Sequence, residues 1–153
     1  MTEKSLLKSS IYALIGNLCI EKVLRMKFAD DAAGLLRTCM RSEGPNIFLE
    51  PKALYNDPAA ETLVPEDFEV PFGKARIVRE GSDATIVAWS WMVQEAEQAA
   101  EVLAIQGIEA EVIDMRTLSP MDTETVAASV KKTGRIVIAD EGYAACGISA
   151  EIG

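Results

Sequence analysis

Short apolar runs alternate with longer amphipathic stretches along residues 74–153. Runs rich in Val, Ile and Ala predict strands, and stretches whose apolar residues recur every three or four positions predict helices. In chain order the predicted elements are strand 75–80, strand 84–90, helix 92–106, strand 110–115, helix 123–132 and strand 135–140. This order predicts an α/β fold in three layers, in which helices cover a mostly parallel sheet and the crossovers are right-handed.

The residues between the first two strands predict how these strands pair. Gly81-Ser82-Asp83 separates the first two strands by a short turn that is typical of a hairpin. We therefore expect strand 75–80 to be the one antiparallel strand and to pair with strand 84–90. The runs "TIVAW" and "RIVIA" are apolar on both faces, which indicates strands that are covered on both sides.

The first 73 residues divide into two further zones. Residues 1–50 predict a helix, with Ala33, Leu36, Cys39 and Met40 on its apolar face and Asp30 or Asp31 as its N-cap, followed by the short strand "NIFLE". Residues 51–73 contain four of the six prolines, which excludes a regular element across them. Their large apolar side chains indicate a stiff connector that lies on both neighbouring zones. The expected domains are thus 1–50, 51–73 and 74–153.

One apolar segment raises the question of a membrane. Residues 11–20, "IYALIGNLCI", are too short to cross about 30 Å of hydrocarbon. Glu21-Lys22 follow where a secretion signal would have a small-residue cleavage site. We interpret the segment as a helix that packs on a partner surface.

Composition narrows the classes of function. The chain has 153 residues and a net charge of −9, which disfavours a nucleic-acid surface. Its three cysteines, Cys19, Cys39 and Cys146, form neither a disulfide framework nor a zinc motif, which indicates a reducing, cytoplasmic setting. The chain has no histidine, the residue that most often serves as a general base or a metal ligand.

The stretch "EVIDMRTLSPMDTETV" carries the densest set of polar residues. Asp114 and Arg116 stand at the end of a predicted strand, where parallel sheets place functional loops, and Asp122 is a natural N-cap for the next helix. The structural interpretation is a capped βα turn, residues 117–121, in which Asp114 and Arg116 pair locally. The functional interpretation is a ligand loop, and spacing alone leaves both open.

Other candidate sites are weaker. "GYAACG" follows a strand but lacks the spacing of a phosphate-binding loop. Glu50, Glu141 and Glu151 lie near predicted strand ends or helix starts without an evident base or nucleophile beside them, and Cys146 lacks a nearby cation that would activate a thiolate. Trp89 and Trp91 flank Ser90 at a strand end and indicate a contact surface.

Several motifs together resemble a known family. "VIDMRTLSPMDTETV" and "SVKKTGRIVIADE" are similar to the C-terminal domain of transketolase-like, thiamine-diphosphate enzymes. The resemblance is strongest to the beta subunits of the first, decarboxylating component of 2-oxo acid dehydrogenase complexes of the pyruvate, branched-chain or acetoin type. "DAAGLLRTCMR", "NIFLEPKALYNDPAAE" and "GISAEI" extend it from about Ala29 to Ile152.

The resemblance implies that cofactor binding and subunit contacts belong to different domains. In such a beta subunit an N-terminal domain grips the pyrimidine ring of thiamine diphosphate, and the C-terminal domain makes subunit contacts. The diphosphate and magnesium are held largely by the alpha subunit. The resemblance further implies two partners, the alpha subunit and the lipoyl acyltransferase core, and a cytoplasmic location, or the mitochondrial matrix in a eukaryote.

The chain departs from the family pattern in ways that matter. The resemblance begins near the end of the pyrimidine-binding domain, so the family's activating glutamate and catalytic histidine have no counterpart here. Ser90 and Gln94 stand where family members often carry Gly and His. We therefore expect a partial chain, a remnant of the pyrimidine-binding domain followed by the C-terminal domain, with no cofactor bound to it alone.

Three hypotheses follow. The first is that the chain supplies subunit-interface scaffold to a 2-oxo acid dehydrogenase beta subunit, through Glu50, Lys52, Tyr55, Trp89, Trp91, Asp114, Arg116 and Glu141. The second is a non-catalytic assembly module of the same fold, which, like the first, forms oligomers. The third is a small nucleotide-binding protein, which would need a phosphate loop that the sequence does not supply.

Overall fold

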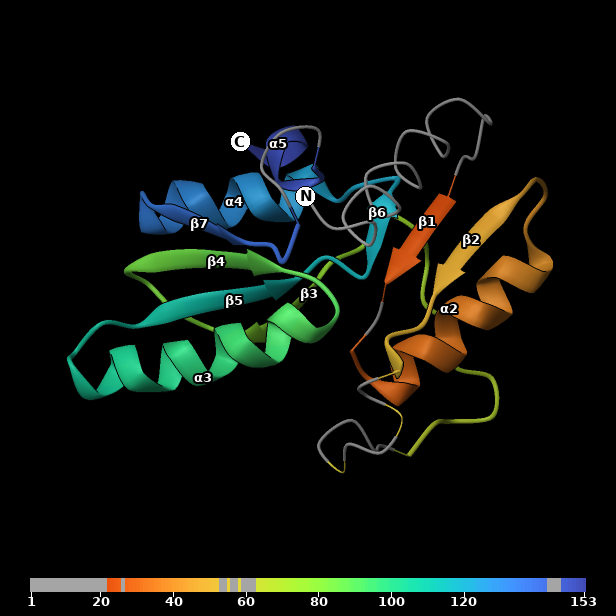
Figure 1. The fold of residues 1–153 in the computed structure, drawn as a ribbon, viewed down its shortest axis with the longest axis horizontal. Helices are drawn as coiled ribbons and strands as arrows, with labels where there is room; N and C mark the ends of the chain where they lie inside the picture. The colour runs from red at the N-terminus through yellow and green to blue at the C-terminus, as the bar shows by residue number, and fades with distance from the viewer. Residues whose placement is uncertain (1–21, 26, 53–54, 56–57, 59–62, 143–146) are drawn as a thin grey trace, which may run out of the picture.

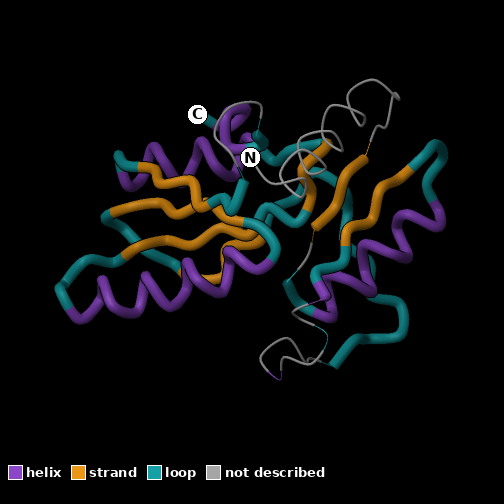
Figure 2. Tube along the Cα trace, viewed as in Figure 1, coloured by secondary structure: helices purple, strands orange, loops and turns teal. Residues whose placement is uncertain are grey.

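The computed structural model describes residues 22–25, 27–52, 55, 58, 63–142 and 147–153. The predicted apolar segment 11–20 and Cys146 lie outside these residues. The elements, drawn in Figures 1 and 2, are in chain order β1 (Lys22–Arg25), α2 (Ala29–Arg41), β2 (Asn46–Leu49), β3 (Arg76–Arg79), β4 (Ala84–Ala88), α3 (Trp91–Ile105), β5 (Ala110–Asp114), β6 (Thr117–Ser119), α4 (Thr123–Thr133), β7 (Ile136–Ala139) and α5 (Ser149–Ile152).

The larger sheet has the strand order β3-β5-β4-β7. Strand β4 is parallel to both β5 and β7, whereas β3 is antiparallel to β5. This confirms the predicted α/β fold, a mostly parallel sheet with one antiparallel strand.

The predicted hairpin is wrong, because β3 pairs with β5 and not with the strand that follows it. The turn after β3 crosses the beginning of β5: the backbone N–H groups of Ser82 and Asp83 both donate to the carbonyl of Glu109, at 2.9 Å each. A Cβ atom on Gly81 would lie 2.2 Å from the backbone nitrogen of Glu111. The chain therefore runs past the first residues of β5. Strand β4 then pairs with the opposite side of β5 from β3, so that β5 separates β3 from β4.

Helices cover the two faces of this sheet unequally. Helix α3 packs Val93, Ala96 and Ala100 on one face, and α4 contributes Val126 to the core on the other face. The central strands β4 and β5 are buried almost throughout. Strand β7 was predicted to be covered on both faces, but Ile136 is 38% and Val137 56% exposed at the outer edge of the sheet.

A second sheet joins segments that are distant in sequence. Its order is β2-β1-β6, with β1 parallel to β2 and antiparallel to β6. Strand β6 lies within residues 117–121, which the sequence pattern predicted as a βα turn, so that part of the prediction is wrong. Figure 1 shows how β6 reaches from the larger sheet to the side of β1.

Helix α2 buries a different face from the predicted one. Asp31, Gly34 and Leu35 are buried, whereas Leu36 and Met40 are exposed. Gly34 sets this orientation, because a Cβ atom there would lie 2.8 Å from Cγ2 of Val70. The predicted Asp cap is also wrong: the N-cap is Phe28, which makes no side-chain cap bond, and both aspartates lie in the first turn.

The connector lies partly on α2. Phe68, Val70 and Phe72 pack with Leu24 and Leu35, as the pattern predicted. Tyr55 and Leu63 are instead 63% and 95% exposed. Among the residues described, no helix has the length and apolar character needed to cross a membrane.

Two glycines are required for different reasons: Gly81 because another backbone lies close to it, and Gly107 because its backbone conformation is left-handed. Gly81→Ala should lower the free energy of unfolding by about 3 kcal/mol or more, because the added methyl group meets backbone atoms of β5 that cannot move aside. Gly107→Ala should cost about 1 kcal/mol, because its φ of +78° is left-handed but the space around it is open. Urea unfolding measures both, and equal losses would contradict the crossing geometry.

Candidate functional site

The polar residues predicted at the end of β5 lie between the two sheets. All five residues of β5 are buried, and Asp114 at its end has no exposed surface. Residues on α2, α3, β3 and the loop before β6 surround this point. We call the residues Lys27, Asp30, Asp31, Arg76, Glu97, Asp114 and Arg116 the junction cluster.

Arg116 connects the larger sheet to α2. Its backbone N–H donates to Oδ1 of Asp114 at 3.0 Å, but its guanidinium group binds elsewhere. Nη1 donates to Oδ1 of Asp31 at 2.8 Å, and Nε and Nη2 donate to the carbonyls of Lys74 and Ala75 at 3.0 and 3.1 Å. Asp114 and Arg116 therefore contact each other locally through the backbone N–H of Arg116, whereas the guanidinium group binds Asp31.

Asp31 accepts from a second arginine. Nη1 of Arg76 on β3 lies 3.0 Å from Oδ2 of Asp31 and 3.1 Å from Oδ2 of Asp30. The same guanidinium group lies over the ring of Phe28, with 4.3 Å between Cζ and the ring centroid. The side chain of Asp31 is 1% exposed, so two arginines neutralise one buried carboxylate.

Lys27 closes the cluster toward α3. It is 6% exposed and forms an ion pair with Glu97. Its ammonium group also lies 4.5 Å from the ring centroid of Phe28. This pair links the segment between β1 and α2 to the outer helix of the larger sheet.

Asp114 is the surplus acid of the cluster. The cluster contains three cations, Lys27, Arg76 and Arg116, and four acids, Asp30, Asp31, Glu97 and Asp114, so its formal charges do not balance. The pKa of Asp114 is raised to about 7, chiefly by complete burial and in part by the nearby Asp31, against the lowering effect of the Arg116 N–H and of the charges on Arg116 and Lys27. Near neutral pH, Asp114 therefore exists in both protonation states.

Several buried polar atoms near Asp114 have no hydrogen-bond partner among the residues described. They belong to the carboxyl ends of β4 and β5, the first turn of α3 and the start of β6: Trp89 Nε1, Ser90 Oγ, Gln94 Oε1, Asp114 Oδ2 and Thr117 Oγ1. Ser90 also has a φ of 59° and a ψ of −136°, a conformation that glycine adopts without strain.

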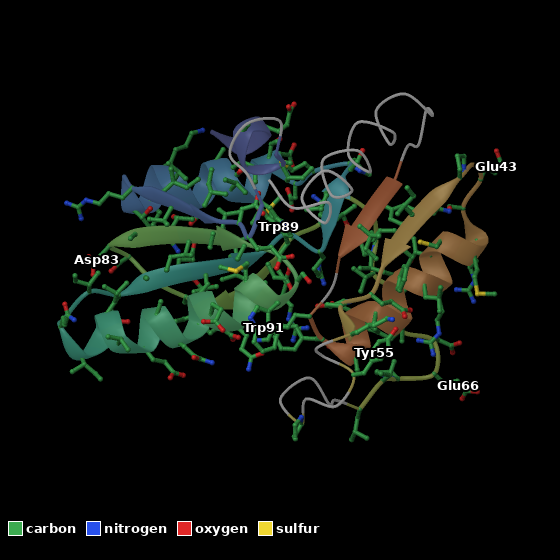
Figure 3. All side chains as sticks on the ribbon, viewed as in Figure 1. Glu43, Tyr55, Glu66, Asp83, Trp89 and Trp91 are labelled. Atoms are coloured by element: carbon green, nitrogen blue, oxygen red, sulfur yellow. The ribbon has the colours of Figure 1, made fainter. Side chains whose placement is uncertain are left out.

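The structure places the predicted contact residues in different environments. Trp89 is 1% exposed in the core, and Asp114 and Arg116 belong to the junction cluster, so these three do not form a free surface. Trp91 is half-buried at the start of α3, and Tyr55 is exposed on the connector (Figure 3). The exposed residues of the predicted set are Glu50, Lys52, Tyr55 and Glu141.

Two of these exposed residues interact. The hydroxyl group of Tyr55 donates to Oε2 of Glu50, and this hydrogen bond raises the pKa of Tyr55. The pair fixes the beginning of the connector beside the end of β2. It does not reach the junction cluster.

Asp122 is the N-cap that the sequence predicted. Its Oδ1 accepts from the backbone N–H of Thr125 at 3.1 Å, and its Oδ2 accepts from the backbone N–H of Ala75 at 2.9 Å. Although burial acts in the opposite direction, these hydrogen bonds lower the pKa of Asp122. The carboxylate thus fastens the start of β3 to the start of α4.

Sequence reasoning missed Lys27, Asp31, Arg76 and Glu97. Their partners are between 45 and 85 residues away, and no local spacing relates them. A helix whose first turn carries two adjacent acids, one of them on the buried side, was the single available indication.

The chemistry of the cluster is that of a closed ionic contact. No group of three His, Cys, Asp or Glu residues in the described part of the chain is placed to hold a metal ion. Each unpartnered polar atom named above has almost no accessible surface. The arrangement holds two sheets in one relative position and offers no open nucleophile or base.

Known proteins resemble this chain in both sequence and fold. Residues 73–153 match the family model described as "Transketolase, C-terminal domain". The chain is 47% identical over 133 residues to pyruvate dehydrogenase E1 component subunit beta-1, mitochondrial, of Arabidopsis thaliana, which covers 86% of this chain and 37% of that protein. It is 40% identical over 144 residues to the corresponding beta subunit of Acholeplasma laidlawii, with coverage of 94% and 43%.

Solved structures agree with the fold. A split-gene transketolase, described as an inactive beta4 tetramer, has a TM-score of 0.72 and 30% identity over 86% of this chain and 42% of that chain. A transketolase from Pichia stipitis, with a TM-score of 0.55 and 16% identity, shares the fold alone. The chain spans less than half the length of these relatives.

Removing the charge of Asp31 should destabilise the protein strongly. Asp31→Asn leaves two arginines without their shared carboxylate and should lower the free energy of unfolding by about 3 kcal/mol. Asp30→Asn is the matched control: Asp30 is more exposed than Asp31 and shares Arg76 with it, so its loss should cost about 1 kcal/mol or less. Urea denaturation compares them, and similar losses would show that the Asp31 contact contributes little.

Asp114 should make stability fall as pH rises. Its pKa is about 7 in the folded chain and 3.8 as the reference value, so the folded state holds more protons between these values. Its contribution is therefore most favourable below about pH 4 and is lost as pH rises through about 7, by at most about 1.4 kcal/mol per pH unit. Asp114→Asn cannot titrate and should remove this slope.

The measurement is the difference in unfolding free energy between wild type and Asp114→Asn at pH 5 and pH 8. Taking the difference removes the contributions of other acids, including Asp122 and Glu111, whose pKa values are lowered. Wild type should lose stability relative to the variant at pH 8. A difference independent of pH would mean that Asp114 is ionised throughout this range.

Proposed function

The chain belongs to the transketolase C-terminal domain family, and from this premise we propose that it forms part of the beta subunit of a thiamine-diphosphate-dependent 2-oxo acid dehydrogenase. The complete enzyme would decarboxylate a 2-oxo acid and transfer the acyl group to a lipoyl arm. Identity of 40–47% to pyruvate dehydrogenase beta subunits over most of this chain carries the proposal.

In this proposal the chain supplies scaffold and subunit contacts. The junction cluster supports that role, because it joins α2 to the family domain by ion pairs that converge on the buried carboxylate of Asp31. A rigid junction keeps contact residues on both sides of it in one geometry. The cluster thus has a function without itself touching a substrate.

The described residues do not offer the donors that thiamine diphosphate with magnesium would need. A magnesium diphosphate needs several oxygen ligands and accessible donors. The described residues contain no group of three acidic, His or Cys residues placed for a metal, and the unpartnered polar atoms are enclosed. The described donor set does not fit the group, so we derive no catalytic step through it and assign its binding to the complete enzyme.

The proposed partners are the alpha subunit of the same component and the lipoyl acyltransferase core. Among the predicted residues, those with accessible side chains form the proposed contact set: Glu50, Lys52, Tyr55, Trp91 and Glu141. Trp91 is the proposed anchor, because tryptophan is the residue type most enriched at the energetic centre of interfaces. A location in the cytoplasm, or in the matrix of a mitochondrion, belongs to the same proposal.

A non-catalytic assembly module remains the second candidate. The enclosed junction cluster favours it, because that cluster holds elements together and exposes no reactive group. Both candidates need partner contacts, and they differ in whether a complex formed with an alpha subunit gains decarboxylase activity.

The experiment mixes the full chain with the alpha subunit of the related Acholeplasma laidlawii pyruvate dehydrogenase. Size-exclusion chromatography with light scattering should detect a complex, and Trp91→Ala should weaken it at least about tenfold by removing an interface anchor. Met40→Ala is the control, since Met40 is 80% exposed and lies outside the proposed contact set.

The outcomes separate the candidates. A complex that depends on Trp91 and decarboxylates pyruvate when thiamine diphosphate and magnesium are added supports the dehydrogenase assignment. A complex without activity supports the assembly module. Failure of the folded wild-type chain to bind the alpha subunit would contradict the proposed partner.

A further inference from the structure

Three buried oxygen atoms belong to the end of β5 and the start of α3. Oδ2 of Asp114, Oγ of Ser90 and Oε1 of Gln94 each have almost no accessible surface and no hydrogen-bond partner among the residues described. Folded proteins rarely leave a buried polar atom without a partner, so three in one region require a common explanation.

The pairing of β4 with β5 places Asp114 on the face of the sheet that α3 covers. Ala88 of β4 lies beside Asp114 of β5 in a parallel register, and residues side by side in this way project to the same face. Ala88 packs with Val93 and Ala96 of α3. The side chain of Asp114 therefore projects toward the first turns of α3.

Ser90 and Gln94 lie one turn apart at the start of the same helix, and residues four apart are neighbours on a helix surface. Ser90 is the N-cap residue, yet its side chain makes no cap hydrogen bond. It follows Ala88 by two residues and is 2% exposed, so it lies close to the end of β5.

An ion pair bounds this region on the side of Gln94. Glu97 follows Gln94 by three residues and binds Lys27, whose charge is close enough to Asp114 to lower the pKa of that carboxyl. Ser90, Gln94 and Glu97 thus lie along one face of α3, the face toward Lys27 and Asp114.

The two other unpartnered atoms of the region lie elsewhere. Trp89 packs with Met115 in the core on the opposite face of the sheet, and Thr117 belongs to β6 of the second sheet. The group to be explained therefore consists of the oxygens of Ser90, Gln94 and Asp114.

We propose that a single internal water molecule is bound between Ser90, Gln94 and Asp114. Oε1 of Gln94 and the ionised Oδ2 of Asp114 are both acceptors, so one water donates a hydrogen to each and accepts the hydroxyl hydrogen of Ser90. Three hydrogen bonds are the typical number for a buried water. The inference rests on buried atoms and does not depend on the proposed function.

The site suits both protonation states of Asp114. Oδ1 accepts from the backbone N–H of Arg116, so a proton on the carboxyl group resides on Oδ2. Oδ2 then donates to the same water, which still donates to Gln94. The water thus connects the titrating group to the first turn of α3 in either state.

A cation is a poorer ligand for this site than water. The charges of Lys27 and Arg116 are close enough to lower the pKa of Asp114, and they would repel a further cation beside its Oδ2. A neutral molecule that both donates and accepts hydrogen bonds meets no such repulsion.

A high-resolution crystal structure of the full chain tests the proposal directly. One water should lie within about 3.2 Å of Oγ of Ser90, Oε1 of Gln94 and Oδ2 of Asp114. A direct hydrogen bond between any two of these atoms, a cation in place of the water, or a site without density would each overturn the proposal.

A second measurement uses two glutamines of α3. Gln94→Leu removes a partner of the water, whereas Gln98→Leu, one turn further along and exposed, removes none. Oxygen-17 relaxation dispersion, which counts long-lived internal waters, should show one fewer in Gln94→Leu and no change in Gln98→Leu. Circular dichroism checks that both variants are folded, and an equal count in wild type and Gln94→Leu would contradict the shared water.

A double-mutant cycle measures whether the water is shared. Ser90→Ala and Gln94→Leu each remove one of its hydrogen bonds, so their losses in urea midpoint should add up to more than the loss in the double variant. Ser90→Ala with Gln98→Leu is the control pair, and its losses should add. Additive losses in both pairs would overturn the proposal.

Discussion

The carboxylate of Asp31 is the contact on which the arrangement of the two sheets depends. It receives Arg76, 45 residues away on β3, and Arg116, 85 residues away after β5. A carboxylate that is 1% exposed is tolerated because two guanidinium groups and their fixed geometry replace water. Directed ion pairs, more than interchangeable apolar packing, thus set the position of α2 against the larger sheet.

The contact at Asp31 also explains why the buried strand β5 leads into the polar residues of the stretch "EVIDMRTLSPMDTETV". After Asp114 the chain must leave one sheet, and Arg116, with a φ of 51°, makes that change of direction while its side chain reaches α2. Thr117–Ser119 then pair with β1, and Asp122 holds both α4 and the start of β3. Residues 114–122 therefore make contacts with both sheets.

What the sequence predicted well was local in origin. The order of strands and helices from β3 to β7, apart from β6, and the cap at Asp122 follow from neighbouring residues. The errors were all long-range: the turn at Ser82 and Asp83 is held by Glu109, the face of α2 is set by Val70 against Gly34, and Asp31 was taken for a cap although distant arginines bind it. No periodicity within one element contains these contacts.

The location of the junction cluster bears on function. Open α/β sheets usually bind their ligands beyond the carboxyl ends of the strands, and the ends of β4 and β5 are where such a site would lie. Here Asp114 is fully buried and accepts from the backbone N–H of Arg116, whose side chain reaches Asp31 of α2. This end of the sheet therefore makes an internal contact, which supports the proposed role of these residues in holding other surfaces in position. An ionic contact suits that purpose, since it is lost as a unit when one partner is removed and permits few intermediate arrangements.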